Sequence, residues 1–251
     1  MLKNGSFTEG WKDVQAPYGY LINQEPNGWN LHWLDVGEDL FGSGDKATGV
    51  PECVHKLAKQ LPANEQLGAA NALILEGDAT YKIFNSGAAF GAELSQTVTG
   101  LQPGSQAALT VPVLVVLYND ADPYAAESGV WVNGEGHWVN SSDMGGSRKW
   151  YHHERNITVP ANGTIEIVVR VKSKWPAPKD FFIDGVKLDA VAGSGGATTA
   201  PPTTMTPPVT TTGSRVLRVG IPAGMQVITT TSSDPNVVVI SIPAGTQIEY
   251  I

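Results

Sequence analysis

Short runs in which apolar and polar residues alternate recur along this chain and constrain its fold more than any other feature. Residues 164–172 show the pattern most clearly, with Ile165, Ile167, Val169 and Val171 on one face and Glu166, Arg170 and Lys172 on the other. A period of two residues is typical of a half-buried strand. Comparable runs cover residues 72–76, 80–84, 93–99, 107–118, 129–133, 150–159 and 181–188. Turn-forming segments separate them, and the chain contains 28 glycines and 17 prolines, so the sequence predicts an all-β sandwich.

One segment predicts a helix instead of a strand. Pro51 precedes residues 52–61 and suits the first turn of a helix, and Val54, Leu57, Ala58 and Leu61 share one helical face. A single short helix leaves the all-β class unchanged.

A run without charged residues divides the chain into two units. Residues 193–213 combine Gly, Thr and Pro with almost nothing to pack, which is typical of a linker. We therefore expect a first unit over residues 1–192 and a second over residues 214–251.

The second unit contains an internal repeat. The segment Ile-Pro-Ala-Gly-Met-Gln-Val at 221–227 recurs as Ile-Pro-Ala-Gly-Thr-Gln-Ile at 242–248. Pro-Ala-Gly is a turn signal, so we expect two related hairpins, built from residues 216–221, 226–231, 237–242 and 246–251. A unit below about 40 residues rarely folds alone without a disulfide or a metal. We therefore expect residues 214–251 to self-associate or to dock onto a scaffold protein.

The charge balance of 16 basic against 24 acidic residues gives a net charge of -8. This surplus disfavours nucleic acid and anionic membrane surfaces as partners. A single cysteine, Cys53, excludes an intramolecular disulfide and any multi-thiolate metal site. The first residues lack the apolar segment of a signal peptide, and no window suits a membrane span. We expect either that a leader has been removed or that the protein is used without Sec export.

Three motifs in the first unit resemble those of jelly-roll carbohydrate-binding modules. Residues 4–11, Asn-Gly-Ser-Phe-Thr-Glu-Gly-Trp, are similar to the N-terminal N-G-x-F-E-x-G-W strand of that family. Residues 94–105 are similar to its Q-x-V-x-G-L-x-P-G-x strand and turn, and residues 181–188 to its closing F-x-I-D-D-V-x-L strand. The resemblance implies a jelly-roll, galactose-binding-like β-sandwich over residues 1–192, with residues 29–66 as an insertion. Similar sandwiches also serve as adhesion, spacer and virion modules, so the fold alone leaves the ligand open.

The resemblance also implies one structural Ca²⁺ between the N-terminal strand and the closing strand, held by hard oxygen ligands. Glu9 and Asp184 match the regions that would supply those ligands. Thr8 and Gly185 stand where the family carries further acidic residues, which removes potential ligands.

Two other clusters offer metal ligands. Residues 119–123 carry alternating carboxylates that, with Glu127, form an alternative calcium site. His137 and one of His152 and His153 form an alternative transition-metal site, since adjacent residues on a strand point to opposite faces.

Sugar recognition requires flat aromatic faces together with amides and carboxylates that bond hydroxyl groups. Residues 131–140 and 150–155 concentrate such groups. Trp131 and Trp138 are expected on adjoining strands of a hairpin, and Trp138 and Tyr151, which polar residues flank, are expected to be exposed. The candidate ligand-binding residues are Trp131, Glu135, His137, Trp138 and Tyr151.

A jelly roll can also be a glycosidase, which needs two carboxyl groups across a cleft. Glu52, Glu127, Glu135 and Glu154 are the candidates, but none lies in a motif that fixes such a role. The chain has no nucleophile elbow. Cys53 and His55 are two residues apart and would not face each other on a helix, which favours a packed cysteine.

Together these features favour a non-catalytic surface or structural module. We expect it to recognise glycans and to be displayed on a larger assembly, such as a phage virion, through its C-terminal β unit. Two alternatives stay open: a secreted bacterial cell-surface carbohydrate-binding or adhesion protein, and a jelly-roll glycoside hydrolase. The expected location is extracellular or on a virion surface.

Overall fold

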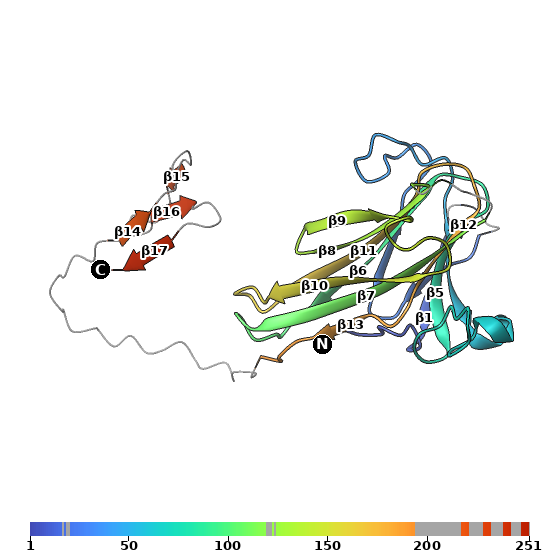
Figure 1. Ribbon diagram of the computed structural model, residues 1–251, viewed down its shortest axis with the longest axis horizontal. Helices are drawn as coiled ribbons and strands as arrows, with labels where there is room; N and C mark the ends of the chain where they lie inside the picture. The colour runs from blue at the N-terminus through green and yellow to red at the C-terminus, as the bar shows by residue number, and fades with distance from the viewer. Residues whose placement is uncertain are drawn as a thin grey trace. The chain divides into compact units, whose positions relative to one another are not determined.

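The computed structural model describes residues 1–16, 18, 21–118, 122 and 124–193, together with the backbone of four short strands between residues 217 and 250 (Figure 1). Contacts divide the chain into two units, Met1–Gly196 and Ala197–Ile251. No helix in the described part is long and apolar enough to cross a membrane.

The first unit is a sandwich of two β-sheets, which confirms the predicted all-β jelly roll. The first sheet runs, in order of pairing, β1 (Trp11–Val14), β2 (Asn23–Pro26), β4 (Glu52–Leu57), β5 (Ala79–Asn85), β12 (Lys179–Ile183), β7 (Gln106–Leu117) and β10 (Trp150–Thr158), and β13 (Lys187–Asp189) also pairs with β7. The second sheet runs β3 (Asn30–Trp33), β6 (Phe90–Val98), β11 (Ile165–Ser173), β8 (Ala126–Val132) and β9 (Glu135–Asn140). Two 3-10 turns, η1 (Ala58–Gln60) and η2 (Ala63–Glu65), lie between β4 and β5.

The core lies between the sheets and is filled from alternate positions of each strand. In β11 the four residues predicted to face inward are buried there, and Glu166, Arg170 and Lys172 face the other side of the sheet. Phe7 adds an aromatic stack, with its ring centroid 5.9 Å from that of Trp29 and 5.5 Å from that of Tyr81. Outside the first sheet, residues between β4 and β5 pack on its other face and form a second, smaller core.

The predicted helix over residues 52–61 is wrong, because this segment forms strand β4 followed by η1. β4 pairs with β5 along its whole length, and Cys53 and His55 alternate into the interior. Asn23 Oδ1 accepts the Cys53 N–H at 2.9 Å, and Gln24 Oε1 accepts the His55 N–H at 2.9 Å. Long-range pairing therefore overrides the helical spacing of the apolar residues. Cys53 is a buried free thiol, as expected.

The run over residues 72–76 does not form the predicted strand either. Leu73 and Ile74 are buried in the second core, against Leu114 and Phe182 of the first sheet. The apolar residues of this run pack on the outer face of the first sheet, and such packing does not require the run to pair with another strand.

The described residues of the C-terminal unit form four strands, β14 (Leu217–Gly220), β15 (Ile228–Thr231), β16 (Val238–Ser241) and β17 (Gln247–Tyr250). Their pairing differs from the expected one, since β14 pairs with β17 and β15 with β16. Among the strands that the structure describes in this unit, those on either side of each Pro-Ala-Gly segment do not pair with each other.

His55 lies in a closed aromatic environment beneath β1. Its ring centroid is 4.3 Å from that of Trp11 and 5.2 Å from that of Tyr81, and neither ring nitrogen has a hydrogen-bond partner. Burial lowers the pKa of His55 to about 4. The imidazole is therefore neutral in the folded protein at neutral pH.

Acid should destabilise the fold through this residue. The folded-state pKa of His55 lies below that of an exposed histidine. The neutral His55 ring therefore contributes fully to the free energy of unfolding above about pH 6.5, and this contribution is lost progressively as the pH falls from there through about 4. Between pH 7 and pH 5 we expect the wild type to lose about 2 kcal/mol more unfolding free energy than His55→Phe. Urea denaturation at both pH values measures this, and His152→Phe, which alters an exposed ring, should behave as the wild type. Equal pH dependence in the wild type and His55→Phe would contradict the assignment.

Candidate functional site

The β8–β9 hairpin places two tryptophans on the outer face of the second sheet. Asn133 and Gly134 form its two-residue turn with φ angles of 51° and 85°, the left-handed conformation that such turns require. Trp131 pairs with Gly136 and Trp138 with Gly129 across the hairpin. The indole centroids lie 4.9 Å apart in an edge-to-face arrangement. The prediction that Trp131 and Trp138 lie on adjoining strands is confirmed.

Trp131 lies across the two glycines that face the tryptophans. A Cβ atom on Gly136 would come within 2.5 Å of Trp131 Cγ, and one on Gly129 within 2.7 Å of its Cζ3. One end of the indole thus covers Gly136 and the other covers Gly129. The absence of side chains at these two positions lets the ring lie against the sheet, and we call this surface the Trp131 platform.

Paired charges surround the platform. Arg170 Nε donates to Glu93 Oε2 at 2.7 Å, and its guanidinium lies 4.6 Å from the centre of the Trp131 ring. Lys172 Nζ lies 3.0 Å from Glu127 Oε2 and 4.1 Å from the centre of the Trp138 ring. The platform is therefore bordered by both donors and acceptors, each neutralised by a neighbour.

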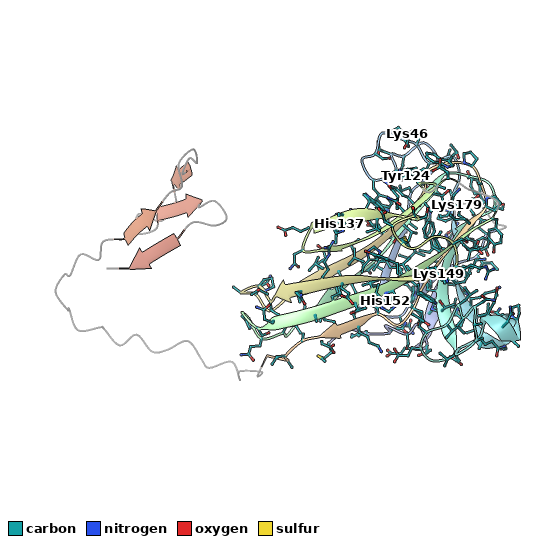
Figure 2. The ribbon with its side chains drawn as sticks, viewed as in Figure 1. Lys46, Tyr124, His137, Lys149, His152 and Lys179 are labelled. Atoms are coloured by element: carbon teal, nitrogen blue, oxygen red, sulfur yellow. The ribbon has the colours of Figure 1, made fainter. Side chains whose placement is uncertain are left out.

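The insertion contributes one wall of the platform. Its loop over residues 34–50, which carries Lys46 near its tip (Figure 2), places Phe41 with its ring centroid 5.5 Å from that of Trp138. The Arg170 guanidinium lies 5.2 Å from the centre of the Phe41 ring. Leu34 and Leu40 anchor the loop in a small cluster of their own.

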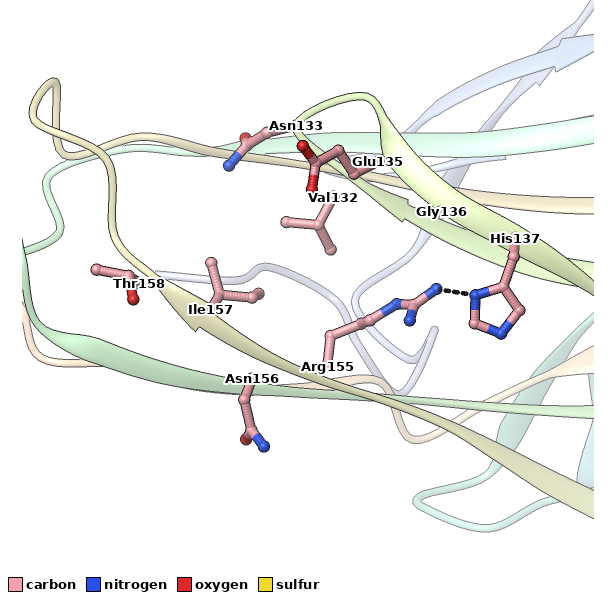
Figure 3. Close-up of a pocket in the computed structure, with 9 residues that line it drawn as sticks. All are labelled: Val132, Asn133, Glu135, Gly136, His137, Arg155, Asn156, Ile157 and Thr158. Atoms are coloured by element: carbon pink, nitrogen blue, oxygen red, sulfur yellow. Dashed lines mark hydrogen bonds between the residues drawn. The ribbon is translucent and has the colours of Figure 1, made fainter. Parts of the chain in front are cut away.

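A cleft of about 490 Å³ opens between β9 and β10, the edge strands of the two sheets (Figure 3). Glu135 and His137 line it from β9, and Arg155 lines it from β10. Arg155 Nη2 lies 2.9 Å from His137 Nδ1 and donates to the Val130 carbonyl at 3.2 Å. The five predicted ligand-binding residues are thus divided, because residues that alternate along β9 point to opposite faces of the sheet.

Tyr151 was expected to be exposed, but it is partly buried against the main core. It pairs with Val113 of β7 and shares that residue's inward side of the sheet. His153, two residues further on, is buried and shares a 2.8 Å hydrogen bond with Ser128 Oγ. Burial and, to a smaller extent, the nearby charges of Arg155 and His137 lower the pKa of His153 to about 4. His152 lies on the outer side of β10 (Figure 2), and no group of three metal-ligating side chains occurs among the described residues.

Asp184 is fully buried and holds a loop. Its Oδ2 accepts the N–H groups of Leu75 and Glu76 at 2.6 and 3.1 Å, and its Oδ1 accepts the N–H of Gly185 at 2.7 Å. Burial raises the pKa of Asp184 to about 7, although these three donors lower it. Glu9 is exposed.

The calcium site expected at Glu9 and Asp184 stays a prediction. Three of the roughly four acceptor positions of the Asp184 carboxylate are occupied by backbone N–H groups, which leaves one for a metal ion. The alternative cluster at 119–123 falls largely outside the described residues. Its partner Glu127 is bound to Lys172 and Lys174, each at 3.0 Å.

The four carboxylates considered for catalysis lie on different parts of the sandwich. Glu127 borders the Trp131 platform, and Glu135 lines the cleft between β9 and β10. Glu154 is exposed on β10, and Glu52 lies on β4. Burial raises the pKa of Glu52.

No protein-family model matches the chain, and no curated protein is significantly similar to it. Among solved structures it is similar to the carbohydrate-binding module TmCBM61, determined in complex with β-1,4-galactotriose, with 18% identity and a TM-score of 0.44 over 75% of this chain and 97% of that one. It is also similar to the enzymatically active domain of tailspike protein 4 of bacteriophage CBA120, with 13% identity and a TM-score of 0.40, over 66% of this chain and 20% of that one. A third is a xylan-binding domain of family 22, with 14% identity and a TM-score of 0.34 over 67% and 89%. The β-sandwich assignment itself rests on the two packed sheets.

Sequence reasoning missed Phe41, Arg155 and Arg170. It also missed the two glycines beneath the Trp131 ring, although a local signal for them was present. Gly-Val-Trp at 129–131 and Gly-His-Trp at 136–138 flank the Asn-Gly turn. This repeat places a glycine opposite each tryptophan. Arg155 had no local signal, because its partner His137 lies on a different sheet.

Proposed function

We propose that this protein is a non-catalytic glycan-recognition module and that the Trp131 platform binds the sugar. The observation that carries the proposal is the Trp131 indole lying across Gly129 and Gly136 on the outer face of the second sheet. Trp131 is partly exposed, so the part of its ring that neither the glycines nor Arg170 covers offers an apolar surface to the C–H face of a pyranose. The ion pairs of Arg170 and Lys172 supply neighbouring donors and acceptors for hydroxyl groups.

A glycan array probed with the full chain tests the proposal. A shallow surface site should give dissociation constants in the micromolar to millimolar range, on the order of -4 to -8 kcal/mol. Binding should be reduced in both Trp131→Ala and Trp138→Ala. Failure to bind any glycan on a broad array would refute it.

We also propose that residues 214–251 attach the module to a larger assembly such as a virion, or to copies of itself. This segment is short and contains only two basic and two acidic residues, so it has little means of folding alone. Light scattering should show a monomer for a chain ending at Ala192 and a larger species for the full chain, alone or with a scaffold. A monomeric full chain that binds no scaffold would contradict this attachment role.

A further inference from the structure

The cleft between β9 and β10 contains an arginine without a carboxylate partner. The structure describes the side chains of three arginines, of which Arg148 pairs with Glu65 at 2.9 Å and Arg170 with Glu93 at 2.7 Å. Among the described residues Arg155 has hydrogen bonds only with the Val130 carbonyl and the His137 ring, and its Nε is buried without a partner. In a chain with 24 acidic residues, a guanidinium held by neutral groups is available to an anion from outside the protein.

The two rims of the cleft offer different chemistry (Figure 3). For His137 Nδ1 to accept a hydrogen bond from Arg155, the ring proton must lie on Nε2, so this end of the cleft presents two donors. Glu135 lies further along β9, and its carboxylate has no hydrogen bond or ion pair among the described residues. Val132 and Ile157, both nearly buried, form an apolar floor.

We propose that this cleft binds the carboxylate-bearing residue of an acidic saccharide, a hexuronate. The carboxylate accepts from Arg155 Nη1, because Nη2 is already hydrogen-bonded and Nε is buried. The sugar hydroxyls donate to Glu135, and the C–H face of the ring covers Val132 and Ile157. The negative charge of the ligand is inferred from Arg155 itself. That the ligand is a sugar acid and not another carboxylic acid rests on the proposed function.

The cleft and the Trp131 platform meet at one strand. Gly136 lines the cleft, and the indole of Trp131 covers the same residue on the other side of β9. One saccharide chain can therefore occupy both sites, with its acidic residue at Arg155.

Nuclear magnetic resonance titration of the full chain with matched monosaccharides tests the proposal. D-glucuronate and D-galacturonate should shift the Arg155 Nε–H signal and bind at least tenfold more tightly than D-glucose and D-galactose. Arg155→Met should abolish this preference and Arg155→Lys should keep part of it. Arg148→Met, which removes an arginine that already has a carboxylate partner, should leave the preference unchanged.

Three results would overturn the uronate site. They are equal binding of the neutral sugars, uronate binding that survives Arg155→Met in a protein with an unchanged backbone spectrum, and no binding of either uronate. Acetate binding as tight as that of the uronates would refute the sugar part. None of these results decides whether glycans bind at Trp131. The glycan array with Trp131→Ala tests that site separately, because Trp131 lies on the other face of β9.

Discussion

Asp184→Ala is expected to lower the free energy of unfolding by about 3 kcal/mol or more. The substitution removes the acceptor of three backbone N–H groups, those of Leu75, Glu76 and Gly185. A buried donor left without a partner costs about 1–3 kcal/mol, and the site is closed to water because Asp184 is fully buried. Urea denaturation at pH 8, where the carboxylate is ionised, measures the loss.

Asp189→Ala is the matched control, because Asp189 is exposed on the neighbouring strand β13 and should change stability by less than about 0.5 kcal/mol. The same experiment separates loop anchoring from calcium binding. If Asp184 only anchors the loop, the wild type should melt at the same temperature in calcium and in chelator. A higher melting temperature in calcium that Asp184→Ala abolishes would support the predicted metal site instead.

The sandwich could be predicted from the sequence because strand periodicity is local. In β11 the alternation of Ile165, Ile167, Val169 and Val171 with polar residues is visible without knowing any neighbour, and the structure buries all four. The β8–β9 hairpin was predictable for the same reason, since Asn133-Gly134 specifies its turn. β4 was not, because the spacing of Val54, Leu57 and Ala58 suits a helix and only the pairing with β5 decides otherwise.

The candidate sites depend on contacts between residues that are distant in sequence. Trp131 and Trp138 were predicted together because one turn connects their strands. The cleft was not predicted, because it requires β9 and β10 to be the edge strands of different sheets at the same side of the sandwich. Asp184 was assigned to a metal through the family resemblance, although its actual partners, Leu75 and Glu76, precede it by more than 100 residues.

Trp131→Ala should weaken glycan binding at least tenfold, or by about 1.4 kcal/mol or more. The ring lies on the outer face and is not part of the main core. Its removal should therefore cost much less stability than the roughly 3–5 kcal/mol of a buried tryptophan. Trp11→Ala is a suitable control, because Trp11 is 37% exposed on β1 of the other sheet.

Calorimetric titration of the tightest array glycan into the wild type, Trp131→Ala and Trp11→Ala tests glycan binding at the platform most directly. The platform predicts that the wild type and Trp11→Ala bind equally, and that Trp131→Ala binds at least tenfold more weakly while keeping most of its unfolding free energy. Binding by Trp131→Ala with the affinity of the wild type would contradict it.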